Sequence, residues 1–309
     1  MKLDSLWFGQ AALAALGDVA FAVALGSAFI GAWLANDGAR SVIAPSHPAW
    51  RQSLRSLAVA AAVLVLADAG WLVYQAASMS GAGLRGAFGA MPTVLAQTHV
   101  GHAWAVACGG ALLLLLAVAL ARPSGPLAGA LLALATLVVA AGKASLGHAA
   151  DSGAFSAAVG VQTVHVAATA VWGGLVIAGG MAVLPALGSS IARGAMIRIA
   201  QRLSGASIAA LAFVIVTGAL NTVRGTGGDF AALDGSTWGR VLLLKLALVA
   251  LALVLAALNR FSALPRLRRT ASTEDAHTFR NVLHLEALAM IGVFIAAAVL
   301  SSTAPIAAG

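Results

Sequence analysis

Four of the seven histidines lie at or near the ends of long apolar segments, and their side chains are the ones best suited to chemistry. His99 and His102 are three positions apart, which places both on one face of a helix. His148 ends the next apolar segment, and His165 lies about 12 Å into the following one at the rise of an α-helix. Imidazole nitrogen is a ligand for copper, zinc and haem iron, so these four residues predict one metal or cofactor site.

Met79 and Met91 lie in the more polar segment before His99, and thioether sulfur is a ligand that Cu(I) prefers. A copper site built from histidine and methionine is therefore the first hypothesis. Haem b is the alternative, because two imidazoles on different helices can act as its axial ligands. The third interpretation is structural, with each histidine capping a helix end or hydrogen-bonding a neighbouring carbonyl group.

Three carboxylates stand within or beside apolar segments, where an ionised group needs a partner or a proton. For Asp18 and Asp68 the candidate counter-ions are Lys245, inside another apolar segment, and Lys143. Charges of this kind mark ion pathways or tether helices to one another, and the sequence leaves both interpretations open. Glu286 lies close to an Arg-rich connection and is expected to pair with an arginine there.

The elements that carry these residues must be membrane helices. Of the 309 residues, 61% are hydrophobic and 9% are charged, whereas a soluble domain has roughly 25% charged residues. A hydrocarbon layer about 30 Å thick needs about 20 apolar residues per helix. The sequence predicts an all-α polytopic transmembrane bundle, one integral membrane domain over residues 1–309. The eight predicted spans are Leu6 to Leu34, Ser53 to Ser78, Thr98 to Ala121, Pro126 to His148, Ala157 to Leu187, Ile199 to Val223, Trp238 to Phe261, and Phe279 to Thr303.

Basic residues indicate the orientation of these spans. The first, third, fifth and seventh connections hold 12 of the 18 Lys and Arg residues. Because Lys and Arg in short loops mark the cytoplasmic side, both termini are expected outside. The net charge of +8 then reflects topology, and we expect membrane lipids, not nucleic acid, around the protein. The segments expected to be outer loops are Met79 to Gln97, Ala149 to Ser156 and Arg224 to Thr237.

Several motifs match those of one known family, in order and at suitable spacing. They are Gly147-His148-Ala149, then His165-Val166-Ala167-Ala168-Thr169-Ala170-Val171-Trp172-Gly173-Gly174-Leu175, then Trp238-Gly239-Arg240, Leu244-Lys245-Leu246 and Leu258-Asn259-Arg260, and finally Arg280 to Glu286 and Leu300 to Pro305. Over residues 145–305 the chain therefore resembles the bacterial copper resistance protein D family, CopD. The first half resembles it mainly in the number of spans and in the region from Thr98 to Trp104.

The resemblance implies a multi-pass protein of the bacterial inner membrane that handles copper, usually beside a periplasmic copper-binding protein of the CopC type. His148, His165, Trp172 and Lys245 lie on family motifs, whereas His99 and His102 are proposed from their position alone. Uptake of copper from the periplasm, for resistance or homeostasis, is the function we expect. The alternatives are a membrane haem b redox protein and a non-catalytic docking partner of a periplasmic copper carrier.

Two further expectations concern mechanism and contacts. The chain has no Gly-rich phosphate-binding motif, so transport would be passive or ion-coupled and a transporter or binding protein is favoured over an enzyme. Gly173 and Gly174, beside Trp172, are small enough to let another helix approach closely. A periplasmic carrier is expected to dock on the outer loops, where Asp229 and Asp234 offer acceptors.

Overall fold

The computed structural model describes residues 5–81, 83–120, 126–153, 155–228, 233 and 235–303. Throughout these residues the regular structure is helical, and eight helical runs are long and apolar enough to cross a membrane, as predicted. Residues 304 and 305 of the last motif lie outside the described ranges. The eight runs are α1 (Ser5–Asn36), α2 (His47–Ser80), α4 (His99–Leu120), α5 (Pro126–Leu146), α6 (Ala157–Ile177) with η2 (Ala178–Val183) and η3 (Leu184–Leu187), α7 (Arg193–Thr226), α8 (Thr237–Leu258) with η5 (Asn259–Ala263) and α9 (Leu264–Thr270), and α10 (Thr273–Ser301).

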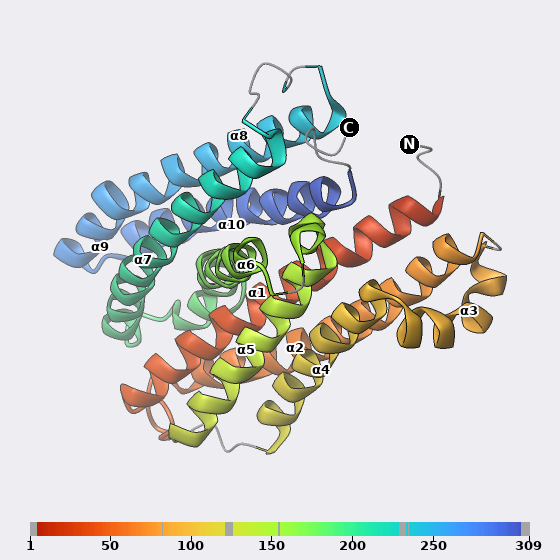
Figure 1. Ribbon diagram of the computed structural model, residues 1–309. Helices are drawn as coiled ribbons and strands as arrows, with labels where there is room; N and C mark the ends of the chain where they lie inside the picture. Colours follow the sequence, from red (N-terminus) through yellow and green to blue (C-terminus); the bar gives the residue numbers. More distant parts are fainter. Residues whose placement is uncertain are drawn as a thin grey trace.

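Helix α6 occupies the centre of the bundle. It packs against α1, α5, α7 and α10, and Figure 1 shows it in the midst of these helices. We compare the most apolar stretch of 18 residues in each helical run. In α6 and its extensions 72% of these residues are buried, whereas in α8 and its continuation 11% are. Helix α8 packs chiefly on α10, so most of its apolar surface faces outward, where lipid would cover it.

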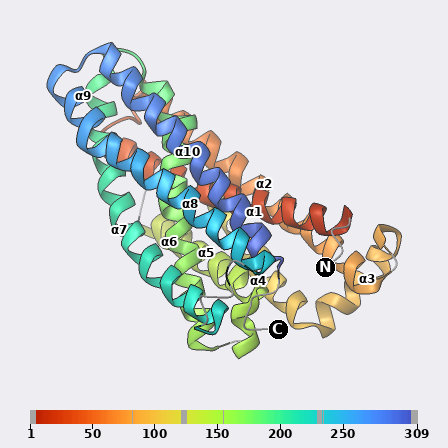
Figure 2. The same cartoon turned by 90° about the horizontal axis from the view of Figure 1, so that it is seen from above.

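The two ends of the bundle differ in their charge. The start of α1, the end of α10 and helix α3 (Gly83–Gln97) lie at one end, and α9 lies at the other (Figures 1 and 2). The Arg-rich connections gather at the α9 end, where α7 and α10 begin at Arg193 and Thr273, earlier than predicted. The Ser272 hydroxyl accepts a hydrogen bond from the Asp275 backbone N–H (3.1 Å) and so starts α10. These helices therefore extend beyond their apolar runs.

Asp37 ties two of these helices together at the α9 end. It follows α1 directly, and its carboxylate accepts hydrogen bonds from Arg198 Nε (3.0 Å) and Arg202 Nη2 (2.9 Å) of α7. Burial raises the pKa of Asp37, but the two arginine hydrogen bonds and charges outweigh it, and the pKa lies below its ordinary value. The ion pairs hold the connection between α1 and α2 against α7.

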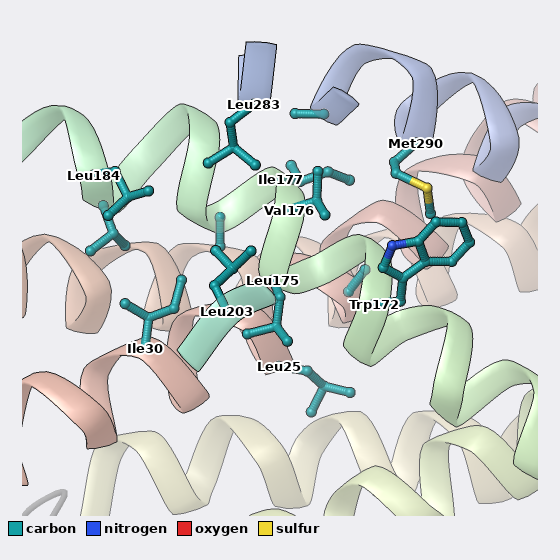
Figure 3. Packing of buried hydrophobic residues seen from close by; sticks show 14 of the residues in the cluster. Leu25, Ile30, Trp172, Leu175, Val176, Ile177, Leu184, Leu203, Leu283 and Met290 are labelled. Carbon is teal, nitrogen blue, oxygen red and sulfur yellow. The ribbon is translucent and has the colours of Figure 1, made fainter. Parts of the chain in front are cut away.

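Helices α1 and α6 meet backbone to backbone at a pair of glycines. A Cβ added to Gly174 would collide with the carbonyl oxygen of Ala22, and one added to Gly26 would collide with the carbonyl oxygen of Gly174. Gly173 faces the other way, and a Cβ there would lie 2.7 Å from the Phe294 ring of α10. Trp172, 1% exposed, lies beside Met290 of α10 in the same core (Figure 3). The small residues thus let α6 approach both neighbours.

The segment expected to be an outer loop, Met79 to Gln97, is a helix over most of its length, and that part of the prediction is wrong. The segment connects two apolar runs, yet α3 runs from Gly83 to Gln97 with Pro92 inside it. Its Ala87 and Val94 are buried against Leu72 and Ala76 of α2. Burial of one face against α2 stabilises a helix that its own propensities would not.

Candidate functional site

The first two predicted ligands, His99 and His102, lie in the first turn of α4. Both side chains are exposed, and both are on one face, as the spacing predicts. The turn is stabilised by the Thr98 hydroxyl, which accepts a hydrogen bond from the Gly101 backbone N–H (3.0 Å). No side-chain hydrogen bond holds either ring among the described residues. The two imidazoles are therefore accessible at the α3 end of the bundle.

His148 begins the short helix η1 (His148–Ser152), which follows α5. Its Nε2 donates a hydrogen bond to the Thr303 carbonyl oxygen (3.2 Å), after the end of α10. Its Nδ1 lies 3.5 Å from the Asp151 carboxylate. Both ring nitrogens thus have partners, and the ring joins the end of α5 to the end of α10.

His165 points from α6 toward α7, where its Nδ1 lies 3.0 Å from the Thr217 hydroxyl oxygen. The Thr217 hydroxyl donates its own proton to the Phe213 carbonyl oxygen (2.6 Å). Thr217 must therefore accept from His165, which makes Nδ1 the protonated nitrogen of the neutral ring and leaves the lone pair on Nε2. A metal-ligating histidine is commonly fixed in this manner, with one nitrogen held by a neighbour and the other available to the metal.

The structure does not draw the four histidines into a single cluster. In the part of the chain that the structure describes, no group of three or more His, Cys, Asp or Glu residues could hold a metal ion. His148 is tied to the end of α10, and His165 to the middle of α7. Met79 is half exposed at the end of α2, and Met91 packs in the contact between α2 and α3. The position of a residue along its helix predicts how deep it lies in the membrane, but it does not predict toward which neighbouring helix its side chain points.

Both intramembrane aspartates lie at one buried cluster with a lysine. Lys143 Nζ of α5 is 2.9 Å from Asp18 Oδ1 of α1 and 3.9 Å from Asp68 Oδ1 of α2. The side chains are 12%, 28% and 11% exposed for Lys143, Asp18 and Asp68. Gly17 lies beside the cluster, and a Cβ there would make ordinary van der Waals contact with the lysine nitrogen at 3.4 Å. Of the two candidate counter-ions, Lys143 is the one in contact.

This charged cluster contains two carboxylates and one ammonium group. Asp68 Oδ2 is buried and has no hydrogen-bond partner among the described residues. The neighbouring indole of Trp104 donates to the Asp68 backbone carbonyl oxygen (2.7 Å) and so leaves the carboxylate unsatisfied. When all three groups are ionised the cluster carries one net negative charge, and the charge of Lys245, which acts on Asp18 from a greater distance, partly offsets it.

Sequence reasoning missed a row of polar contacts between α6 and α7. Asn221 Nδ2 donates to Gln162 Oε1 (2.7 Å), one turn from the pair formed by His165 and Thr217. The signal is in the spacing, since Gln162 and His165 are three residues apart, and Thr217 and Asn221 are four. Lys245 of α8 lies near enough for its charge to act on His165, and it forms no ion pair within the described ranges. These contacts make the interface between α6 and α7 polar inside an otherwise apolar bundle.

Comparison with known protein families covers most of the chain. Residues 3–158 match the model described as copper resistance protein D-like, N-terminal domain. Residues 197–300 match the model described as copper resistance protein D. No curated protein and no solved structure matches the chain.

Proposed function

Because the chain belongs to the copper resistance protein D family, we propose that it takes up copper from the periplasm across the bacterial inner membrane. The eight candidate spans and the family together make it a multi-pass membrane protein of copper resistance. Copper ion is the substrate in this proposal. His165 carries the greatest weight, because its hydrogen bond to Thr217 presents Nε2 as a ligand inside the bundle.

The route that we propose begins at the α3 end of the bundle. The accessible rings of His99 and His102 are the first ligands, aided by Met79 and Met91. His148 can join them only by giving up its contact with Thr303 or Asp151. His165 is the inner ligand of this route. The Asp18 and Asp68 cluster, which has two carboxylates in contact with one lysine, supplies the next cation-attracting position. The charge of Lys245 acts on His165 and would disfavour any cation bound there, so copper binding at His165 requires this charge to be balanced.

Copper binding by purified protein tests the proposal. Full-length protein in detergent is loaded with Cu(I), and the bound metal is measured by elemental analysis. His165→Ala is expected to lose most of the copper, because a ligand is removed from a site that the bundle holds in place. His277→Ala is the matched control, since this exposed histidine lies at the α9 end. Full copper retention by His165→Ala contradicts the proposed site.

The same preparation separates the haem b alternative from copper transport. A haem protein would show a Soret band that shifts when dithionite reduces the iron, and the band would be lost in His165→Ala. Uptake of copper into proteoliposomes, with no such band, supports transport. Copper bound without uptake would favour a docking role instead.

The direction of uptake depends on the orientation, which we propose as both termini outside. A phosphatase that is active only in the periplasm should be active when fused after Gly309 and inactive when fused after Arg269. The opposite result would place the histidines at the α3 end in the cytoplasm and reverse the route.

A CopC-type periplasmic carrier is the partner that we propose for the α3 end. Helix α3 offers a formed surface there, with Phe88 70% exposed. Asp229 and Asp234 of the other expected docking segment lie outside the described residues. Crosslinks from α3 to a co-expressed carrier would support this handover, and crosslinks only from α9 would contradict it.

A further inference from the structure

A second polar site lies toward the other end of the bundle, away from the four candidate ligand histidines. A cavity of about 220 Å³ opens between α6, α7, η5 and α10. Most of its lining is apolar, including the indole of Trp172. Five polar side chains also line it, and they stand where the apolar runs of α7, α8 and α10 give way to the Arg-rich end. These are Ser204, Ser207, Asn259, Arg260 and Glu286.

Glu286 is the buried acid of this cavity. It is 3% exposed, and no lysine, arginine or histidine of the described chain forms an ion pair with it, so the pairing predicted from the sequence is wrong. Arg260 is the other charged residue in the described lining of the cavity. Its Nη1 instead donates a hydrogen bond to the Ser204 hydroxyl (2.8 Å). An ionised Glu286 would thus be a buried charge without a counter-ion.

The amide of Asn259 is already engaged by the backbone of α10. Oriented to suit its neighbours, it donates from Nδ2 to the Phe279 carbonyl oxygen (3.2 Å) and accepts at Oδ1 from the Leu283 N–H (3.1 Å). Its oxygen is therefore not available to a cation. Asn259 also begins the π-helical turn η5, a local widening of the helix that is often found at functional sites.

Two oxygen groups remain for a ligand in the cavity, the Glu286 carboxylate and the Ser207 hydroxyl. Ser207 Oγ is buried and has no hydrogen-bond partner in the described structure. Hard metal cations take about six or more oxygen ligands, and Cu(I) prefers sulfur or nitrogen, so this set suits neither. A proton needs only one carboxylate oxygen, and the resulting carboxyl group is neutral and needs no counter-ion in the cavity.

We propose that Glu286 is a proton-binding site toward the end of the bundle opposite His99, His102 and His148. Its carboxylate binds one proton that enters through the cavity past Arg260, and the neutral carboxyl releases it by the same path. The inference concerns protons and not copper, so it holds whatever the cargo of the route is. In a chain with no ATP-binding motif, such a group is the kind that couples transport to a proton gradient.

Infrared difference spectroscopy of the full-length protein in lipid vesicles tests this proposal. The pH is stepped, and the C=O stretching band of protonated carboxyl groups is recorded. Wild type should show a band from a buried carboxyl group that Glu286→Gln lacks. Glu274→Gln is the matched control, because Glu274 lies in the first turn of the same helix and is exposed. This variant should keep the band.

Two further variants keep the test decisive. Asn259→Ala should shift the frequency of the band, because the Asn259 side chain is the polar neighbour of the Glu286 carboxyl group. If Glu286→Gln does not fold, Glu286→Asp should still show a band at a shifted frequency. The proposal would be overturned if Glu286→Gln showed the same band as wild type. It would also be overturned if the wild-type band disappeared when NaCl is added at constant pH. Because none of these readouts involves copper, they are independent of the His165 experiment.

Discussion

Replacing Lys143 with methionine removes the positive charge from the buried cluster while keeping a side chain of similar length. At an effective dielectric constant of about 20, the attractions at 2.9 Å to Asp18 and at 3.9 Å to Asp68 are about 6 and about 4 kcal/mol. Desolvation of the lysine offsets much of this sum, and Asp18 is 28% exposed, which screens its share. Loss of one partner from a buried ion pair commonly costs about 3 to 5 kcal/mol, and we expect the lower part of that range.

The free energy of unfolding in mixed micelles, titrated with a denaturing detergent, measures this loss. The decisive control adds Asp18→Asn and Asp68→Asn to Lys143→Met, because a cluster without any charge has no unpaired carboxylate to bury. This triple variant should recover most of the stability that the single variant loses. A single variant within about 0.5 kcal/mol of wild type would refute the reasoning, since that is the range of an uninvolved surface substitution. So would a triple variant no more stable than the single one.

Three other outcomes follow from contacts described above. Thr217→Val should weaken copper binding about 10- to 100-fold by freeing Nδ1 of the neighbouring histidine, whereas Thr222→Val, whose hydroxyl bonds only its own helix, should not. The pKa of Asp37 is lowered, so its ion pairs contribute fully to stability above the ordinary carboxyl pKa of about 3.9, and this contribution is lost as the pH falls below it. The thermal unfolding midpoint should therefore fall across this pH range in wild type, and Asp37→Asn should lack this fall. Gly174→Ala should lower the free energy of unfolding by about 1 to 3 kcal/mol, because the added Cβ forces α1 and α6 apart. Gly160→Ala is the control in the same helix, and it should be neutral or slightly stabilising because the space around Gly160 is open. Equal unfolding midpoints for the two variants would contradict the glycine contact.

The spans were predictable because length and apolarity alone decide whether a helix can cross a membrane. The sequence also placed Asp18 and Asp68 inside spans, where a partner is needed. It did not choose between Lys143 and Lys245, because both lie in apolar segments and only the packing of α5 against α1 and α2 brings one of them into contact. Helix α3 was missed for a related reason, since its stability comes from burial of Ala87 and Val94 and not from local propensity.

The site was less predictable than the fold. Histidines at similar depth on three helices suggested one cluster, yet each helix turns its residue toward a different neighbour. The partner of His165 depends on the rotation of α7 about its axis, which places Thr217 opposite the ring. The spacing of Thr217 and Asn221 marks one face of α7, but it does not show which neighbouring helix this face meets.

The backbone contact between α1 and α6 also limits the order in which the chain can assemble. Gly26 and Gly174 are 148 residues apart, so at about 5 to 20 residues per second a ribosome needs about 7 to 30 s to make the second after the first. During this interval α1 is already in the membrane without its central partner. Helix α2 is synthesised next and packs along α1, and this early hairpin must keep the glycine face of α1 available until α6 inserts beside it.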